Sequence, residues 1–391
     1  MVVVGGCGRA GLPLGLSLAD SGLRVVLYDV DAAVVDLVQS GAMPFQERGA
    51  PEALRRALAA GSLEASSDPR HVARAKTVIV VIGTPIDEYL NPDAQAVPDA
   101  ITEISGNLRD GQLLVLRSTV FPGVTAMVEG LVQRLGVDVD VAFCPERIAE
   151  GYAMTELREL PQIISGRNAR AVERARDLFQ VLTPQTVELS PEEAELAKLF
   201  TNAWRYIKFA AANQFYMMAS QLGVDFQQIR DALAYEYPRA ADMPSAGFAA
   251  GPCLLKDTMQ LAAFNNNNFA LGHVSMMINE GLPLFVVSQM ERRFDLPKMT
   301  VGLLGMAFKG DSDDVRASLS YKLKRILKLK ARAVRCTDPH VAVDKDLLPL
   351  EEVVAEADLL VIGAPHREYA GLTARAPIVD IWGVSGSGIG L

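Results

Sequence analysis

Short apolar runs alternate with amphipathic stretches over the first third of the chain. The apolar runs are short, rich in β-branched residues and lie at Val2–Gly5, Arg24–Tyr28, Thr77–Ile82, Leu113–Leu116 and Val139–Phe143. The stretches between them that have helical spacing lie at Leu12–Ser21, Asp31–Ser40 and Pro51–Ala60. This alternation of buried strands and amphipathic helices predicts a parallel sheet covered by helices.

The pattern changes in the middle of the chain. From Pro191 to about Arg292, helical spacing dominates and no run reads as a strand. The segment Glu192–Leu222 predicts one unusually long helix, and its alanine and aromatic positions form a packing surface. A long helix between two domains often pairs with a second copy. We therefore expect a homodimer or a larger homo-oligomer.

Strand–helix alternation resumes after Leu296-Pro297. The predicted strands are Thr300–Leu304, Ala333–Thr337, Leu359–Ile362 and Ile378–Ile381, and the predicted helices are Ser320–Lys328 and Leu350–Ala357. The fold class that follows is α/β, with two Rossmann-like parallel-sheet domains joined by a central helical region that contains the long helix. We place the three domains at residues 1–188, 189–296 and 297–391.

Composition narrows the functional classes. The net charge is −9 and half of the residues are apolar, so a basic face for nucleic acid is not expected. The most basic segment, Lys322–Lys330, has helical spacing and is typical of a solvated helix face. No apolar run approaches 18 residues, so no membrane span is expected. The four cysteines and four histidines are scattered, which predicts reduced thiols, no metal site and a cytoplasmic location.

A glycine-rich turn follows the first predicted strand. Gly6, Gly8 and Gly11 form a GxGxxG motif that opens the first helix, where backbone amides can meet a pyrophosphate. Asp29 ends the second strand, eighteen residues after Gly11. A carboxylate there can accept a hydrogen bond from a ribose 2′-hydroxyl and would repel a 2′-phosphate, which favours NAD over NADP. The alternative is an ordinary turn in which Asp29 caps a helix.

Three further loops follow predicted strands of the first sheet. They are Gly83-Thr84-Pro85, Ser118–Gly123, which contains Thr119, and Pro145–Gly151, which contains Glu146 and Glu150. Ligands of open α/β sheets bind at the carboxyl edge of the strands. Each of these segments, taken alone, also fits an ordinary connecting loop rich in turn-forming residues.

Two segments of the helical middle carry candidate catalytic groups. Lys198 and Asn202 are four residues apart and so share one helix face, from which an ammonium and an amide can stabilise an oxyanion. Cys253 lies in Gly251–Asp257, followed at three and four residues by Lys256 and Asp257. A nearby cation favours the reactive thiolate, although most cysteines are buried and inert. A helical lysine is likewise most often only solvated.

The segment Phe308–Arg316 follows the first strand of the second α/β domain. Lys309 and Arg316 offer cations for phosphates, and Phe308 offers a ring for a base. A charged surface loop is the plain alternative.

The ordered set of these motifs resembles the nucleotide-sugar dehydrogenases, the family of UDP-glucose, GDP-mannose and UDP-N-acetylhexosamine dehydrogenases. The motifs are GCGRAGLP, GTP, STVFPG, PERIAEG, AELAKLFTN, GPCLLKD and MAFKGDSDDVR, and they extend over nearly the whole chain. The resemblance implies oxidation of a sugar's terminal primary alcohol to a carboxylate with two NAD. Residues 1–188 would bind NAD, residues 189–296 would dimerise, and residues 297–391 would bind the nucleotide sugar.

The resemblance also implies a role for each site residue. Cofactor contacts fall on Gly6, Gly8, Gly11, Asp29, Thr84, Lys256 and Arg316. Thr119 lies near the cofactor and belongs to the catalytic set. The catalytic set comprises Cys253 as the covalent nucleophile, Lys198 and Asn202 around the reacting oxygen, and Asp257 with Glu150 for protons and water. Substrate contacts fall on Glu146, Phe308, Lys309 and Arg239, the last resembling an arginine that reaches the neighbouring subunit's substrate. Either Lys198 or a water held by Asp257 can take the first proton.

The loop before Cys253 departs from the pattern of many members. Ala250 stands at one position of a glycine pair, and Phe248 is displaced by one residue. The loop leaves the hexose open between UDP-glucose, a UDP-N-acetylhexosamine and dTDP-glucose. Two other classes also remain: a two-electron β-hydroxyacid dehydrogenase of the 6-phosphogluconate type, which needs no cysteine, and a non-enzymatic NAD-binding protein.

Overall fold

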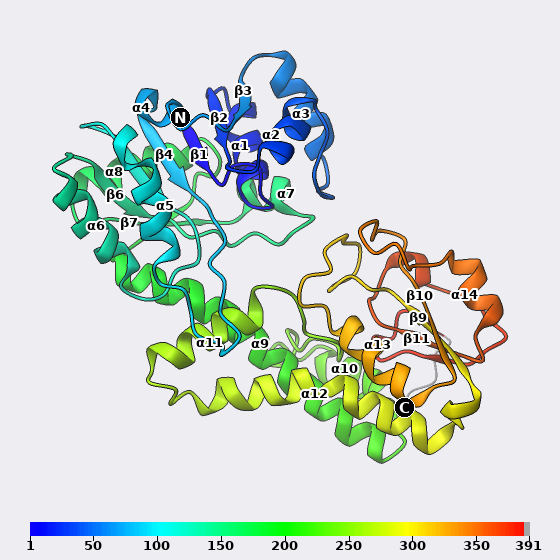
Figure 1. Ribbon diagram of the computed structural model, residues 1–391. Helices are drawn as coiled ribbons and strands as arrows, with labels where there is room; N and C mark the ends of the chain where they lie inside the picture. The colour runs from blue at the N-terminus through cyan, green and yellow to red at the C-terminus, as the bar shows by residue number, and fades with distance from the viewer. Residues whose placement is uncertain (387–391) are drawn as a thin grey trace. The chain divides into compact units, whose positions relative to one another are not determined.

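The computed structural model describes residues 1–386 and divides into two compact units (Figure 1). Unit 1 contains residues 1–201 and 263–266, and unit 2 contains residues 202–262 and 267–386 of the described chain. Each unit is built around a parallel sheet, so the predicted α/β class with two parallel-sheet domains is confirmed. The boundary between the units falls inside the long helix, at Thr201 and Asn202.

Unit 1 contains a six-stranded parallel sheet with strand order β3-β2-β1-β4-β5-β6. Its strands are β1 Val2–Val4, β2 Val25–Tyr28, β3 Leu63–Ser66, β4 Thr77–Val80, β5 Leu113–Leu116 and β6 Asp140–Phe143. The strand order reverses between β1 and β4, and ligands of doubly wound sheets bind at the carboxyl edge beside such a switch point. A separate parallel pair is formed by β7 Gln162–Ser165 and β8 Thr186–Leu189.

Helices cover both faces of this sheet. The helices of unit 1 are α1 Gly11–Asp20, α2 Ala32–Gln39, α3 Ala50–Ala59, α4 His71–Arg74, α5 Ala96–Ile104, α6 Val124–Leu135, α7 Ala153–Glu159 and α8 Ala169–Gln180, with a 3-10 turn η1 at Ser105–Asn107. Alternate strand residues face opposite clusters: Val3 belongs to one core, and Val2 and Val4 to the other.

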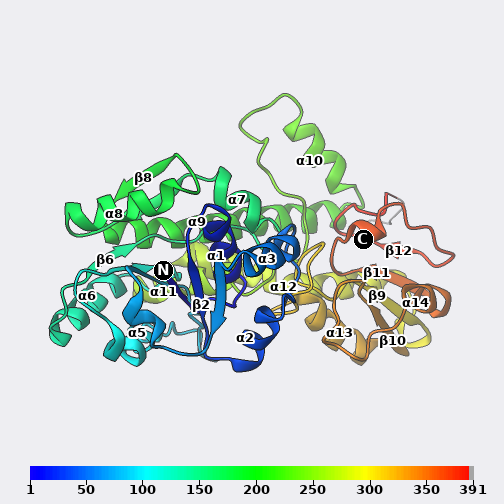
Figure 2. The same ribbon diagram turned by 90° about the horizontal axis from the view of Figure 1, so that it is seen from above.

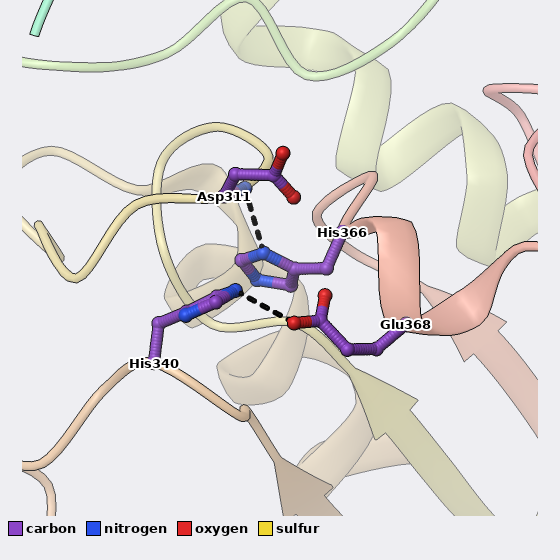
Figure 3. A group of neighbouring side chains, drawn as sticks. All are labelled: Asp311, His340, His366 and Glu368. Atoms are coloured by element: carbon purple, nitrogen blue, oxygen red, sulfur yellow. Dashed lines mark hydrogen bonds and ion pairs between the residues drawn. The ribbon is translucent and has the colours of Figure 1, made fainter. Parts of the chain in front are cut away.

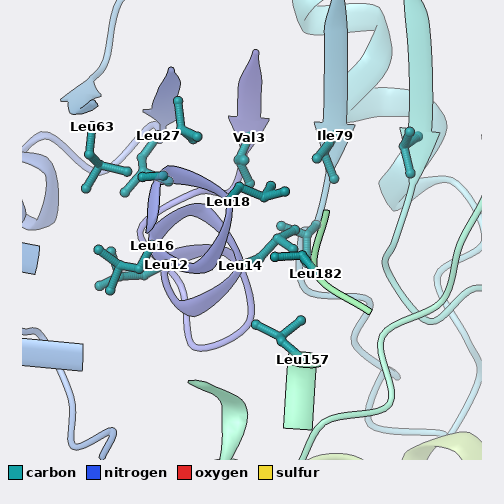
Figure 4. Close-up of a cluster of buried hydrophobic side chains, with 14 of the residues drawn as sticks. Val3, Leu12, Leu14, Leu16, Leu18, Leu27, Leu63, Ile79, Leu157 and Leu182 are labelled. Atoms are coloured by element: carbon teal, nitrogen blue, oxygen red, sulfur yellow. The ribbon is translucent and has the colours of Figure 1, made fainter. Parts of the chain in front are cut away.

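Helix α1 is apolar on all sides because it is covered on all sides. Its four leucines at positions 12, 14, 16 and 18 are fully buried. They belong to the same core as Val3, Leu27 and Ile79 of the sheet and Leu157 of α7 (Figure 4). Helix α1 also packs against α3 and α7 (Figure 2). This burial fixes the helix whose first turn opens the predicted cofactor site.

The predicted long helix is one helix, α9, at Pro191–Gln221. It is followed by α10 Phe226–Ala234, α11 Leu254–Phe264, α12 Ala270–Arg293 and a 3-10 turn η2 at Leu296–Lys298. Helix α12 is long and apolar enough to cross a membrane by length and composition, which is weak evidence because core helices of soluble proteins pass the same test. It contains Pro283, and 39% of its most apolar window is buried.

Unit 2 contains a four-stranded parallel sheet with strand order β10-β9-β11-β12. Its strands are β9 Thr300–Leu304, β10 Ala333–Thr337, β11 Leu359–Ile362 and β12 Ile378–Val379. Its further helices are α13 Leu319–Lys330 and α14 Leu350–Glu356, with a 3-10 turn η3 at Arg367–Tyr369. The basic segment Lys322–Lys330 lies on α13, where Leu323 and Leu327 are buried and Lys328, Leu329 and Lys330 are exposed, so its outer side is the solvated helix face that its spacing predicted.

Candidate active site

The glycine turn of unit 1 is shaped by backbone packing. The amides of Gly5 and Gly6 donate to the carbonyl of Tyr28 at 2.9 and 3.0 Å, which joins the turn to β2. A Cβ on Gly6 would lie 2.6 Å from the carbonyl oxygen of Val3, and one on Gly11 would lie 2.4 Å from that of Gly5. Only glycine fits at these two positions.

Gly8 differs from these two glycines. It is exposed, and a Cβ there would meet nothing closer than 3.5 Å. The open side of the turn therefore lies at Gly8, where a pyrophosphate can approach the backbone. Cys7 is 2% exposed, and burial raises the pKa of its thiol to about 12, with Asp29 and Asp31 adding to the shift. Cys7 is a packing residue of the turn.

Asp29 lies beside the turn, at the carboxyl end of β2. Its Oδ2 accepts from the amide of Cys7 at 3.1 Å, and its Oδ1 accepts from the amide of Asp31 at 3.3 Å. The cap of α2 is Asp31, which accepts from the amides of Ala33 and Val34. Asp29 is therefore not the helix cap of the alternative interpretation, and its part-exposed carboxylate fits a ribose hydroxyl.

The loops after β4 and β5 are tied to each other. Thr84 Oγ1 donates to the carbonyl of Thr119 at 2.5 Å. Ser118 Oγ donates to the carbonyl of Ile82 and accepts from its amide. Because β4 adjoins β1 in the sheet, both predicted threonines lie at the carboxyl edge beside the switch point.

A buried glutamate on α9 anchors the Thr119 loop. Glu195 is 1% exposed and accepts from the amides of Gly123 and Thr125 at 2.7 and 2.8 Å, and from the Thr125 hydroxyl. These bonds place a carboxylate at the N-terminus of α6, where the helix dipole favours it. Lys198, which is 9% exposed, lies three residues further along α9.

Glu146 is held by protein groups on both carboxylate oxygens. Oε2 lies 2.5 Å from Nη2 of Arg117 and accepts from its Nε at 2.8 Å, while Oε1 accepts from the amides of Arg147 and Ile148. Arg117 is 1% exposed and stacks on the ring of Phe179. Here Glu146 anchors the loop after β6, and its contact with substrate stays a prediction.

Glu150, on the same loop, reaches the cofactor turn. Its Oε2 lies 3.8 Å from Nη1 of Arg9, a residue of the GxGxxG motif, and both side chains are about one-fifth exposed. The two predicted features, the glycine turn and the Pro145–Gly151 loop, therefore lie together in unit 1.

In unit 2, three predicted residues meet next to Cys253. Asp257 is fully buried, and its two oxygens lie 2.5 Å from Nδ2 of Asn202 and from Nζ of Lys256. The amide of Asp257 donates to the carbonyl of Cys253 at 2.9 Å, so Cys253 stands at the start of α11 with an exposed side chain. Within residues 1–386 the four cysteines are thiols, and the other three are buried.

The loop that leads to Cys253 is clamped at both ends. A Cβ on Gly251 would lie 2.5 Å from the ring of Phe308, and the amide of Gly251 donates to the carbonyl of Ala317 at 3.3 Å. At the other end, Asn213 Oδ1 accepts from the amide of Gly247 and Nδ2 donates to its carbonyl. Phe308 thus frames the cysteine loop directly.

Phe248 and Trp382 explain the unusual sequence of this loop. Phe248 is 3% exposed and packs edge-to-face on Trp382 at 6.3 Å between ring centroids. A Cβ on Gly247 would lie 2.1 Å from the same indole ring. The displaced Phe248 is therefore a core residue. Sequence reasoning missed Asn213 and Trp382, because their contacts with Gly247 join distant parts of the chain.

The remaining predicted residues of unit 2 have local partners. Nε and Nη2 of Arg316 bond the carboxylate of Asp314, and Nζ of Lys309 lies 5.8 Å from the ring centre of Phe308. Arg239 is exposed and lies over the ring of Tyr237 at 5.7 Å. The roles proposed for these cations toward cofactor and substrate stay predictions.

Two histidines that are distant in sequence meet in unit 2. His340 and His366 lie near Asp311 and Glu368, and ligand atoms of the four residues are within 4.8 Å of one another (Figure 3). The Nδ1 of His366 accepts from the amide of Asp311 at 2.9 Å, so Nε2 carries the proton and donates to Asp338 at 3.0 Å. Both nitrogens of His366 are engaged, which leaves it no lone pair for a metal.

Asp338 connects this group to the loop after β9. Its side chain is fully buried. Oδ2 accepts from the amides of Met306 and Ala307 at 2.6 and 2.9 Å, and Oδ1 accepts from those of His340 and Val341. With His366, five donors surround the carboxylate.

Three models of one protein family match consecutive parts of the chain. The NAD binding domain of the UDP-glucose/GDP-mannose dehydrogenase family matches residues 1–183. Its central domain matches residues 192–280, and its UDP binding domain matches residues 302–386.

Individual proteins match over nearly the same length. UDP-N-acetyl-D-mannosamine dehydrogenase of Pyrococcus horikoshii is 30% identical over 94% of this chain and 90% of its own. The solved structure of the UDP-D-ManNAc dehydrogenase from that organism has a TM-score of 0.89 at 29% identity, covering 97% of this chain and 95% of that one. A UDP-glucose dehydrogenase structure from Pyrobaculum islandicum has a TM-score of 0.91 at 28% identity, covering 99% and 94%.

Proposed function

Because this chain belongs to the UDP-glucose/GDP-mannose dehydrogenase family of NAD-dependent nucleotide-sugar dehydrogenases, we propose that it oxidises a nucleotide sugar's primary alcohol to a carboxylate by four electrons. The observation that carries the proposal is the exposed Cys253 at the start of α11, one turn before the Asp257 network. A soft nucleophile is what a second oxidation of the same carbon needs, because it holds the aldehyde as an adduct.

The proposed reaction has two oxidations and a hydrolysis. The alcohol carbon loses a hydride to NAD and its hydroxyl loses a proton, which gives an aldehyde. The thiolate of Cys253 adds to the aldehyde carbon, and the protonated adduct is a thiohemiacetal. Loss of a second hydride and a proton gives a thioester, and water releases the carboxylate and restores the thiolate. NAD supplies the two-electron acceptor for each hydride.

The proposed catalytic residues suit the charge changes of this reaction. Lys198 and Asn202 stabilise the oxygen as it becomes negative, by the same physics as an oxyanion hole. The hydrogen bond from Asn202 Nδ2 to Asp257 orients the amide before substrate arrives. Asp257 and Glu150 handle protons and water. Lys198 and a water on Asp257 stay the two candidates for the first base.

We propose a UDP-hexose as the substrate, and a UDP-N-acetylhexosamine is the first candidate. A UDP binding domain model matches residues 302–386, and the Pyrococcus horikoshii relative is named for UDP-N-acetyl-D-mannosamine. UDP-glucose is the second candidate, in line with the Pyrobaculum islandicum structure, and dTDP-glucose is the third. A cytoplasmic location without membrane contact stays a prediction.

A homodimer is proposed from the exposed face of α9. Large apolar side chains there are between 46% and 81% exposed in the single chain and repeat at helical spacing: Phe200, Trp204, Phe215 and Met218, followed by Leu222 just past the helix. An apolar stripe of this kind is typical of a surface covered by a partner. Trp204→Glu should shift the mass in solution, measured by light scattering, from dimer to monomer. A wild-type monomer would contradict the proposal.

The reaction is tested with a panel of nucleotide sugars, NAD and the Cys253→Ser variant. The variant should lose steady turnover while its NAD dissociation constant stays within about twofold of wild type, since Cys253 is not in the cofactor turn. Full activity of Cys253→Ser would remove the covalent role and favour a two-electron dehydrogenase. No turnover by the wild type with any nucleotide sugar would favour the non-enzymatic alternative.

A further inference from the structure

Glu47 is a buried carboxylate outside the predicted site. It lies between α2 and α3, in Phe45–Gly49, and is 5% exposed. Its Oε2 accepts from the amide of Gly151 at 2.7 Å and its Oε1 from that of Ala153 at 2.9 Å. A carboxylate is buried at high cost unless hydrogen bonds replace its hydration. Here those bonds go to backbone about a hundred residues away, immediately after Glu150.

The backbone on the other side of Glu150 is fixed in the same way. The amide of Ala149 donates to Oε2 of Glu156 at 2.6 Å. The backbone amides on both sides of Glu150, those of Ala149 and Gly151, therefore each donate to a carboxylate. We call this pair of hydrogen bonds the bracket of Glu150. Gly151 has a φ of +82°, a conformation that glycine adopts without strain, so the chain turns sharply where Glu47 holds it.

The neighbours of Glu47 contact two residues near Glu150, Arg9 and Tyr152. The guanidinium of Arg9 lies 5.0 Å from the ring centre of Phe45 and 3.8 Å from Oε2 of Glu150. The guanidinium of Arg48 lies 4.6 Å from the ring centre of Tyr152. Phe45–Arg48 therefore contacts the glycine turn through Arg9 and the Glu150 loop through Tyr152.

We propose that Glu47 is a positioning residue for Glu150: its carboxylate fixes the backbone of Gly151 and Ala153 so that the Glu150 carboxylate is held beside Arg9. This inference rests on the proposed role of Glu150 in thioester hydrolysis. Loss of the bracket should slow that step most, because displacement of a catalytic group by about 1 Å can cost about 100-fold.

The test follows NADH formation after rapid mixing of the full chain with NAD and the active sugar nucleotide. Glu47→Gln keeps the side-chain shape but turns an NH₂ group toward a backbone N–H. It should give a burst of two NADH per active site, followed by steady turnover about 10- to 100-fold slower than wild type. Intact mass spectrometry of the quenched variant should show the acyl group on the protein. The NAD dissociation constant should change by less than about threefold.

Glu52→Gln is the matched control, because Glu52 is 67% exposed and pairs along α3 with Arg55. It should behave as wild type. The decisive comparison is Glu150→Gln with the double variant Glu47→Gln/Glu150→Gln. If Glu47 acts through Glu150, the double variant hydrolyses the thioester no more slowly than Glu150→Gln alone.

Two results would overturn the inference. One is an additive slowing in the double variant, and the other is an equal slowing of burst and steady state together with a lower melting temperature, which marks a structural role.

If Glu150→Gln hydrolyses the thioester normally, the proposed role of Glu150 fails separately from the bracket. Should Glu47→Gln not fold, Arg48→Leu, which removes the contact with Tyr152, should show the same burst with turnover reduced about threefold. Wild-type kinetics of Arg48→Leu would then count against the bracket.

Discussion

The two parallel-sheet units repeat one local arrangement and use it differently. In unit 1, Gly5 has a φ of +74° and donates to the carbonyl of Tyr28, and in unit 2 Gly305 has a φ of +91° and donates to that of Thr337. In both, an aspartate just after the second strand accepts from the amides of the turn. These aspartates are Asp29 and Asp338.

The surroundings of the two aspartates differ. Asp29 accepts two amides and stays part exposed, and α1 starts at Gly11, directly after the turn. Asp338 has five donors and no exposed side-chain surface, and α13 starts only at Leu319. An accessible acid beside a helix start suits the cofactor contact proposed for Asp29. A carboxylate with all its acceptor sites used, as in Asp338, is an internal anchor, and the longer segment between its turn and α13 contains Phe308 and Lys309, the proposed substrate contacts.

The largest expected effect that tests this contrast is loss of Asp338. Asp338→Ala leaves four backbone amides and the buried His366 without their acceptor, so it should lower the free energy of unfolding by about 3–5 kcal/mol. Chemical denaturation measures the loss. NAD affinity should stay within about threefold, since the cofactor turn is in unit 1. A stability change below about 1 kcal/mol would show that Asp338 is no anchor.

Asp29→Ala should give the opposite pattern. Removing an acceptor for the ribose hydroxyls should weaken NAD binding by about 1.5–3 kcal/mol, or roughly 10- to 150-fold, and reduce discrimination against NADP. Stability should change little because the two amides that Asp29 accepts lie at a part-exposed site. Titration calorimetry with NAD and NADP measures both affinities. Unchanged NAD affinity would mean that Asp29 does not contact the cofactor.

The pH dependence of stability should also report the anchoring role of Asp338. Burial raises the pKa of Asp338, but the hydrogen bonds from His366, Ala307 and His340 outweigh it and lower the pKa from 3.8 to about 2. A lowered pKa stabilises the fold above pH 3.8, and this contribution of about 2 kcal/mol is lost as the pH falls from 3.8 to 2. Asp338→Asn should remove that part of the acid-induced loss, seen in melting curves between pH 5 and pH 2. Parallel curves for the two proteins would contradict it.

The smallest effect on stability is expected at Gly8. A Cβ there meets only the carbonyl oxygen of Gly5 at 3.5 Å, an ordinary contact, so Gly8→Ala should change the free energy of unfolding by no more than about 0.5 kcal/mol. NAD affinity should nevertheless fall, because the methyl group occupies the open side of the turn. Gly11→Ala, with its clash at 2.4 Å, should lower both stability and affinity. Equal stability losses in the two variants would remove the distinction.

Much of the fold could be predicted because the spacing of apolar residues along the chain reflects helices and strands directly. The long helix α9 and most strands appear where apolar periodicity places them. Strands β3 and β8 were missed because they are partly exposed and mix polar with apolar residues, and β7 was missed because only the middle two of its four residues are apolar, unlike the apolar runs of β4 and β5. Such short segments carry too little alternation to separate from loop.

The site could be predicted only as far as its motifs. Cys253, Asp257 and the glycine turn are contiguous signals, and the structure brings Asn202, Lys256 and Asp257 together. Their supporting residues could not be found in the same way. Glu47 bonds backbone 104 residues away, and Arg117 bonds Glu146 across 29 residues. Contacts between residues so far apart in the sequence depend on tertiary packing, and no local sequence pattern predicts them.

The most direct test of the central claim is the number of NADH formed per sugar nucleotide consumed. We expect two, because Cys253 keeps the aldehyde on the protein until the second hydride has left. Absorbance of NADH and chromatography of the sugar, measured on the same samples, give the ratio. A ratio of one, with free aldehyde as the product, would contradict the four-electron reaction.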